Sequence, residues 1–253
     1  MVASTGDPVR QTPVVSADDD RSGVPRPDAP EVAAGALTLG YNAVLHKVLP
    51  EVTYIPTNLA AAGALTGLAV ASGCDADDLG LARRHVARGV KLGLTTAVAL
   101  SCAVALAVAL PGTRRFFEED RVGRTREGVY HAAVRIPIGT ALAEELIFRG
   151  ALFGILARRR STLQAALVSS ALFGVWHVLP AHESFERDRG TDEARPAARA
   201  AAVAGNVAFT TAAGLGFSWL RVRSRSLAAP VIVHAAVNAA AYVGSWWASG
   251  RAA

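Results

Sequence analysis

Cysteine, methionine and aromatic residues are scarce in this chain of 253 residues, which has two cysteines, one methionine and 6% aromatic residues. The spacing of Cys74 and Cys102 does not fit a zinc knuckle, and two cysteines are too few for a disulfide framework. We therefore expect both thiols to be inert packing residues.

Charged residues are scarce as well, since they make up 19% of the chain against about a quarter in a typical soluble domain. The formal net charge is +5, but no basic face interleaved with aromatic residues is present, which argues against a nucleic-acid partner. The arginines gather instead at the ends of long apolar runs. Hydrophobic residues make up 51% of the chain, and this distribution favours a partner of another kind, the lipid bilayer.

The apolar runs predict an all-α fold, a polytopic transmembrane bundle, because a helix needs about 20 apolar residues to cross a bilayer. We count about seven spans, at residues 32–49, 52–74, 92–112, 136–157, 161–181, 200–220 and 226–250. Residues 1–30 mix Pro, Asp, Ser, Thr and Arg without hydrophobic periodicity, which predicts a disordered N-terminal tail. Residues 31–250 are then a single transmembrane domain.

Basic clusters between the runs indicate an orientation. With seven spans, three short loops rich in arginine fall on one side, which the positive-inside rule makes cytoplasmic. We therefore expect an integral protein of the cell (plasma) membrane with a cytoplasmic N-terminus. The loops carry Arg83, Arg84, Arg88 and Lys91; Arg158–Arg160; and Arg221, Arg223 and Arg225.

Three polar clusters interrupt the apolar runs, although each ionisable group near the centre of a span costs at least about 2.5 kcal/mol. The first is Glu144-Glu145-Leu146-Ile147-Phe148-Arg149. On a helix, Glu145 and Arg149 share a face, which predicts a supporting ion pair. Glu144 lies about 100° away and has no local partner. A lone carboxylate in an apolar pocket suits a general base that activates water.

The other two clusters are Phe173-Gly174-Val175-Trp176-His177 and His234-Ala235-Ala236-Val237-Asn238. Taken alone, His177 fits a satisfied residue near a helix end, and His234 with Asn238 fits an interhelical hydrogen-bond pair. Taken together with Glu144, these side chains come from three spans and can converge on one water-accessible cavity.

Convergence has a geometric condition. Straight, upright helices would separate His177 and His234 by roughly 10 Å or more in depth. We therefore predict strongly tilted helices around an intramembrane cavity, helped by kinks near Pro180 and Pro230 or by a late start of the last helix.

The order of the motifs, EExxxR, FxxxH and HxxxN, resembles that of the CPBP family, the CAAX-protease and bacteriocin-processing (Abi) group of intramembrane proteases. The resemblance covers about residues 130–245, with each motif in its own apolar span. It implies an intramembrane endopeptidase for membrane-associated or prenylated-type peptides or proteins. The eukaryotic relative removes three residues after a prenylated cysteine.

The resemblance also implies roles for individual residues. Glu144 and His177 would activate the attacking water, and His234 and Asn238 would bind the oxyanion of the tetrahedral intermediate. The supporting residues would be Glu145, Arg149 and Phe173. A glutamate mechanism without a cofactor is preferred. A zinc site of Glu144, His177 and His234 stays open, although asparagine is a poor zinc ligand and HExxH is absent.

Two other functions fit the same residues. A catalytically silent family member would act as an immunity factor or membrane scaffold. A transporter would use buried glutamate, arginine and histidine as a proton route. Transporters are typically built from two matching halves, and no such symmetry is visible in the sequence.

Overall fold

The computed structural model of the protein describes residues 26–114, 117, 125–189 and 196–249, and every element in these ranges is helical. The all-α prediction is therefore confirmed. The longer helices are α1 (Ala29–Lys47), α2 (Tyr54–Ala71), α3 (Val86–Ala109), α8 (Thr162–Trp176), α9 (Val178–Arg189), α10 (Pro196–Ser224) and α11 (Ala228–Ala248). Short elements precede or follow them: η1 (Glu51–Thr53), η2 (Arg83–His85) and α4 (Pro111–Arg114).

Helices occupy all seven predicted spans. Five of them are long and apolar enough to cross a membrane, namely Glu51–Ala71, Arg83–Ala109, Thr162–Glu186, Pro196–Ser224 and Ala228–Ala248. The protein is thus an integral membrane protein. Most of the predicted N-terminal tail lies outside the described residues. The chain is already helical at Ala29, where the Asp28 side chain accepts a hydrogen bond from the Glu31 backbone N–H at 3.0 Å and caps α1.

One long helix carries the EExxxR motif. It consists of α5 (Thr125–Tyr130), η3 (His131–Leu142), α6 (Ala143–Glu145), η4 (Leu146–Leu152) and α7 (Phe153–Ala157), which follow one another without a break. The segments η3 and η4 are π-helical, and Pro137 lies inside η3. Proline has no backbone N–H and its ring clashes with the carbonyl four residues earlier. In a π-helix each backbone hydrogen bond joins residues five positions apart, so the turn is wider and avoids that clash.

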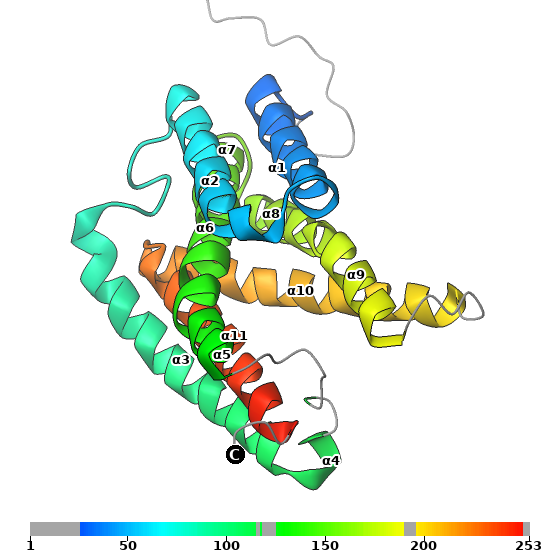
Figure 1. Ribbon diagram of the computed structural model, residues 1–253. Helices are drawn as coiled ribbons and strands as arrows, with labels where there is room; N and C mark the ends of the chain where they lie inside the picture. The colour runs from blue at the N-terminus through cyan, green and yellow to red at the C-terminus, as the bar shows by residue number, and fades with distance from the viewer. Residues whose placement is uncertain (1–25, 115–116, 118–124, 190–195, 250–253) are drawn as a thin grey trace, which may run out of the picture.

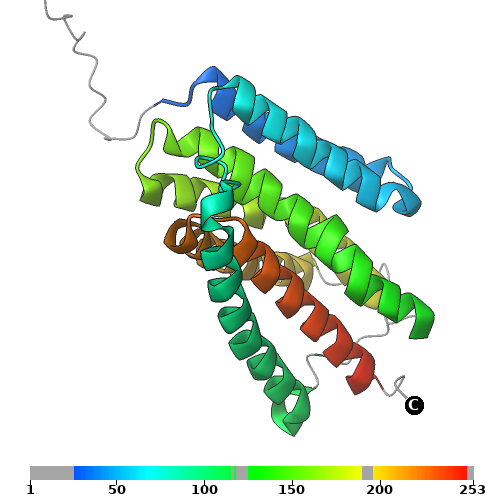
Figure 2. The ribbon, with the colours of Figure 1, turned by 90° about the vertical axis from the view of Figure 1, so that its left-hand side faces the viewer.

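The long helix is central to the bundle. Figure 2 shows it between the α1–α2 hairpin on one side and the pair α3 and α11 on the other. In Figure 1, α10 runs across the direction of this helix, so the bundle is far from a set of parallel rods. The predicted steep tilt of the helices is confirmed. It lets residues at different positions along their own helices reach one place.

Small residues let α3 and α11 approach closely. A Cβ atom built on Gly93 would lie 3.1 Å from the Cα of Ala229, and one built on Gly89 would lie 2.7 Å from the Cβ of Ser226. Glycines four apart on one helix face are a common device for close helix packing in membranes. This packing fixes the start of α11, and therefore the position of His234 one and a half turns later.

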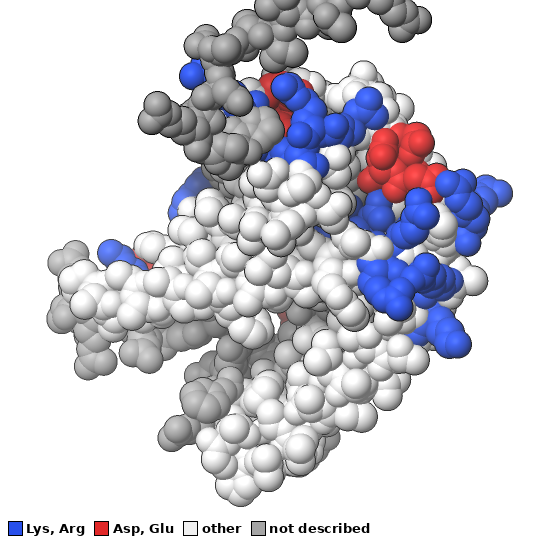
Figure 3. All heavy atoms as spheres, turned by 180° about the vertical axis from the view of Figure 1, so that it is seen from behind, with Lys and Arg blue, Asp and Glu red and all other residues white. Residues whose placement is uncertain are grey.

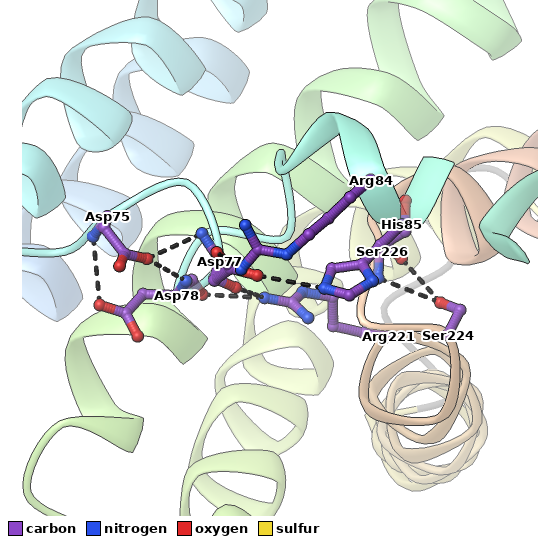
Figure 4. Close-up of polar contacts among 8 residues, drawn as sticks. All are labelled: Asp75, Asp77, Asp78, Arg84, His85, Arg221, Ser224 and Ser226. Atoms are coloured by element: carbon purple, nitrogen blue, oxygen red, sulfur yellow. Dashed lines mark hydrogen bonds and ion pairs between the residues drawn. The ribbon is translucent and has the colours of Figure 1, made fainter. Parts of the chain in front are cut away.

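The loop between α2 and α3 is tied to the end of α10 through Arg221 (Figure 4). Asp75 accepts hydrogen bonds from the backbone N–H groups of Asp78 at 2.9 Å and Asp77 at 2.7 Å, and these bonds hold the pKa of the Asp75 carboxyl below its usual value. Arg221 of α10 donates to the carbonyls of Asp77 and Asp78 at 2.8 and 2.9 Å. The loop thus fastens α10 at the end of the bundle that carries the arginine clusters.

Candidate active site

A buried triad lies at the centre of the bundle. Glu145 Oε1 accepts from Arg149 Nη1 at 3.2 Å and lies 2.9 Å from Nδ1 of His234. The side chains of Glu145 and Arg149 are both fully buried, with 0% of their surface exposed. The ion pair predicted from the sequence is therefore present. The contact to His234 was not predicted, because it joins residues 89 positions apart.

Glu144 points to the other nitrogen of the same ring. Its Oε2 lies 3.9 Å from His234 Nε2, beyond hydrogen-bond distance, and has no hydrogen-bond partner among the described residues. His234 thus stands between two buried carboxylates. Oε2 of Glu145 also has no hydrogen-bond partner within the described residues, but of the two glutamates only Glu144 lines the cavity, where it can bind a further group.

An aromatic cluster surrounds these charges. Arg149 lies over the ring of Phe173, with Cζ 4.3 Å from the ring centroid, and within 5.3 Å of the centroid of Phe217. Phe217 stacks on His234 at a centroid distance of 4.8 Å and an interplanar angle of 18°. The faces of these rings attract the Arg149 guanidinium, and this attraction offsets part of the free energy that the cation loses when it is removed from water. Phe173 has the packing role that the sequence predicts, whereas Phe217 was missed because it lies in no motif.

His177 lies at the break between α8 and α9. Its Nδ1 is 2.7 Å from the carbonyl oxygen of Phe173. A carbonyl only accepts hydrogen bonds, so Nδ1 carries the proton, and a neutral ring has an unprotonated Nε2. The kink expected near Pro180 occurs at this residue, and the last helix begins at Ala228, two residues after the start of the predicted span.

The predicted separation in depth between the two histidines is removed by these features. Both His177 and His234 contact the ring of Phe173, at centroid distances of 4.5 and 6.0 Å. Three features act together here: the tilt of the helices, the break between α8 and α9, and the late start of α11. They bring three of the four predicted catalytic side chains, Glu144, His177 and His234, to the ring of Phe173 or to residues that contact this ring.

Asn238 is the fourth predicted catalytic residue. It follows His234 by one turn of α11 and is half-buried. In the described part of the chain it makes no hydrogen bond, and it does not line the cavity beside Glu144. Its role in binding an oxyanion therefore stays a prediction.

A cavity of about 450 Å³ opens beside Glu144 and His177. Polar side chains missed by the sequence-based prediction line it together with these two residues. They are His46, Glu51, Tyr54, Arg135, Thr140 and Glu183. Each lies at a helix end or outside the three motifs, so no local pattern marks it. Ion pairs across the cavity, such as His46 Nδ1 to Glu183 Oε2 at 3.1 Å, connect the N-terminal hairpin to the catalytic helices.

The residues do not form a ready metal site. Within the described ranges, no group of three or more His, Cys, Asp and Glu side chains is placed to hold a metal ion. The proposed zinc ligands Glu144 and His234 are 3.9 Å apart, but His177 does not complete a set with them. The zinc alternative thus has no preformed ligand set in this conformation.

An apolar groove of about 520 Å³ is lined mainly by residues of α3, α10 and α11, among them Phe217. Leu100, Ala213, Gly216 and Val237 contribute to its walls. Phe217 both lines the groove and stacks on His234, so one ring borders the groove and the buried triad.

Comparison with known proteins agrees with the motifs. Residues 127–240 match the family model described as type II CAAX prenyl endopeptidase Rce1-like. The match contains all three motifs and overlaps most of the segment, about residues 130–245, for which the sequence resembles the CPBP group. Neither the curated proteins nor the solved structures give a match for the chain.

Proposed function

We propose that the chain, whose residues 127–240 match the Rce1-like model of type II CAAX prenyl endopeptidases, cleaves peptide bonds by glutamate-activated water. The observation that carries the proposal is the unpartnered Oε2 of Glu144, which lies beside a cavity that water can enter. A general base must be within reach of the proton it removes, and this carboxylate has no competing donor.

Glu144 and His177 would act together on the water. Both line the same cavity, and the hydrogen bond from Nδ1 to the Phe173 carbonyl fixes the His177 ring so that Nε2 can accept a proton. A water held between the carboxylate and this nitrogen would lose a proton as its oxygen attacks the peptide carbonyl. The same proton would then pass to the leaving amine.

His234 would stabilise the oxyanion. Glu145 accepts from its Nδ1, which leaves Nε2 directed toward the reacting groups. With the ring doubly protonated, Glu144, Glu145, Arg149 and His234 have a net charge of zero, which favours this state in a buried site. Nε2–H can then donate to the developing negative oxygen, a contribution worth about 10²–10³ in rate. Asn238 would supply a second donor.

A metal mechanism makes a different prediction about the purified enzyme. The test is cleavage of a membrane-tethered peptide by wild-type protein in nanodiscs, with and without a zinc chelator. Under the glutamate mechanism the rate stays unchanged by the chelator. Loss of cleavage that added zinc restores would replace it by the zinc mechanism, with Glu144, His177 and His234 brought together as ligands.

We propose membrane-associated or prenylated peptides or proteins as substrates. The apolar groove beside Phe217 supports a lipid-modified substrate, since its lining is apolar and one of its lining residues, Phe217, stacks on His234. A prenyl chain in this groove would place the attached cysteine near His234.

Filling the groove tests this substrate class. Gly216 of α10 lines the groove, and a Cβ added there would meet nothing within 4 Å. Gly216→Leu should therefore fold normally but raise KM for a farnesylated peptide by about tenfold or more, and leave KM for the same peptide without the lipid unchanged. Gly205→Leu is the matched control, because Gly205 lies on the same helix in equally open space and does not line the groove. Equal effects on both peptides would contradict the groove assignment.

We also propose that the N-terminus is cytoplasmic and that the protein lies in the plasma membrane. Lys and Arg side chains gather at one end of the molecule in Figure 3, in agreement with the positive-inside rule. The helix α2 runs from the cavity mouth at Glu51 to this basic end, so the mouth would open on the outer side.

Labelling of Val52→Cys tests the orientation, because Val52 is 87% exposed beside Glu51. In a Cys102→Ser background, with Cys74 buried, a membrane-impermeant maleimide should label the new cysteine in intact cells. Labelling only in inverted vesicles would reverse the orientation without affecting the peptidase proposal.

A further inference from the structure

Five exposed cations at the basic end of the molecule make no ion pair and no side-chain hydrogen bond with any described residue. They lie around the start of α3 and the end of α10, and we call them the basic surface: Arg83, Arg88, Lys91, Arg223 and Arg225. Other cations at this end are bound within the protein. Arg160, for instance, pairs with Glu31 at 2.7 Å.

The two helices bring these cations together. A Cβ atom built on Gly89 of α3 would lie 2.7 Å from the Cβ of Ser226, which lies in the turn between α10 and α11. Arg88 and Arg225 each come directly before one of these two residues. The cations of both helices therefore belong to one surface, and Figure 3 shows Lys and Arg side chains gathered at this end.

The aspartates of the neighbouring loop do not neutralise the basic surface, because other groups already bind them. Asp77 pairs with Arg84 and lies 3.2 Å from Nε2 of His85. Asp78 pairs with Arg158 at 3.5 Å. The third aspartate of the loop accepts two backbone N–H groups, as described above. Like charges repel, so a surface that keeps this many cations attracts an anion from outside the protein.

The backbone of Arg225 is strained. Its φ is +60°, and every other described residue with a left-handed φ is a glycine. Arg225 directly follows the last residue of α10, where glycine is usual because a side chain disfavours this conformation. An exposed arginine thus stands where glycine would fold more easily. Strain that persists at an unpaired cation points to a ligand for that cation.

Exposed apolar side chains lie one helical turn away from the cations. Leu94 follows Lys91 by three residues and is 53% exposed, and Trp219 precedes Arg223 by four residues and is 58% exposed. At these spacings each pair shares a helix face. Both helices are long and apolar enough to cross a membrane. The surface therefore matches an amphiphile that has an anionic head and hydrocarbon chains.

We propose that the basic surface binds the headgroups of anionic phospholipids, with their acyl chains along α3 and α10. The planar fork of an arginine donates two hydrogen bonds to phosphate oxygens, and lysine adds a point charge. A headgroup between Arg88 and Arg225 bridges α3 and the turn before α11. The lipid thus stabilises the packing that fixes the start of α11. This inference does not depend on the peptidase proposal.

Tryptophan quenching by brominated lipids tests the proposal. The full-length protein is placed in phosphatidylcholine nanodiscs that contain increasing amounts of brominated phosphatidylglycerol or brominated phosphatidylcholine. The signal of Trp219 is the difference between this protein and its Trp219→Phe variant in the same discs. The association constant should be about tenfold or more higher for phosphatidylglycerol, since each cation near an anionic lipid surface contributes to binding. High salt should lower this ratio, because it screens exposed charges.

Substitutions locate the source of the preference. Arg223→Gln combined with Arg225→Gln should lower the ratio of the two association constants by about threefold or more. Lys47→Gln combined with Arg199→Gln is the matched control, since it removes two exposed cations near the opposite ends of α1 and α10. The control should leave the ratio unchanged.

Arg225→Gly separates lipid binding from folding. It removes the cation and also relieves the left-handed strain, so the thermal unfolding midpoint in pure phosphatidylcholine should rise while the ratio falls. A falling ratio in a protein that is more stable cannot come from misfolding.

Three results would overturn the proposal. The first is equal association of the two lipids with the wild-type protein. The second is a ratio that the Arg223→Gln and Arg225→Gln pair leaves unchanged, or that the control pair lowers equally. The third is a preference abolished by inorganic phosphate at constant ionic strength, which would assign the surface to a soluble phosphate instead. None of these measurements uses peptide cleavage.

Discussion

Glu144→Gln is expected to lower kcat for peptide cleavage by about 10²–10⁴-fold, the usual contribution of a general base. Glutamine keeps the size and the hydrogen-bonding shape of the side chain but cannot take a proton from water. Because Glu144 Oε2 has no hydrogen-bond partner in the described structure and lies 3.9 Å from His234 Nε2, the substitution should break no hydrogen bond of that oxygen. The thermal unfolding midpoint should therefore stay close to that of the wild type, and KM should change little.

The matched control is Glu186→Gln, which changes a carboxylate that does not line the cavity and pairs with His182 at 3.5 Å. It should cleave at the wild-type rate. Unchanged cleavage by the Glu144→Gln protein would remove Glu144 from the role of base. If the Glu144→Gln protein loses activity and also has a clearly lower thermal unfolding midpoint, Glu144 has a structural role instead.

Arg149→Met is expected to cost about 3–5 kcal/mol of unfolding free energy, because it leaves the fully buried Glu145 without its cation. Methionine has a similar length and can fill the space between the rings of Phe173 and Phe217. The loss of unfolding free energy would therefore come mainly from the uncompensated charge of Glu145, and less from a cavity at position 149. The measurement is denaturant unfolding of the purified protein in micelles, followed by circular dichroism.

A double variant separates charge from packing. Glu145→Gln with Arg149→Met removes both charges, so it should be more stable than Arg149→Met alone. Arg159→Met is the control, since Arg159 pairs with Asp28 at the surface and its loss should change stability little. A double variant whose loss equals the sum of the two single losses would contradict the view that the charges compensate each other.

The two substitutions should also differ in their effect on catalysis. Glu145 holds Nδ1 of His234, so Arg149→Met should lower kcat as well as stability, because it disturbs the carboxylate that orients the ring. Glu144→Gln should lower kcat alone. Adjacent glutamates thus have separate tasks, and their positions about 100° apart on the helix account for the separation.

Much of this division could be predicted from the sequence. The apolar runs predicted helices at seven places, and hydropathy is a local property that does not depend on the partner of each helix. The spacing of Glu145 and Arg149 predicted their ion pair, because residues four apart on a helix are neighbours. Motif order alone selected Glu144, His177, His234 and Asn238 as candidates.

The contacts between helices could not be predicted in this way. Glu145 to His234 and Phe217 to His234 join residues far apart in the chain, so they depend on the tilt of α10 and the close packing of α11. An α-helical period would put Arg135 on the face opposite Glu144, nine residues away, whereas the segment around Pro137 is π-helical and both side chains line the cavity.

The sequence by itself determined that the chain is a helical membrane protein, and it selected the side chains that we propose for its chemistry. The reason is that hydrophobic length and helical spacing act over a few turns. The tertiary structure alone decided that Glu145 also contacts His234, that Glu144 lines the cavity, and that Arg135 lines the same cavity. Those outcomes depend on helix winding and crossing, which are set by packing between segments distant in sequence.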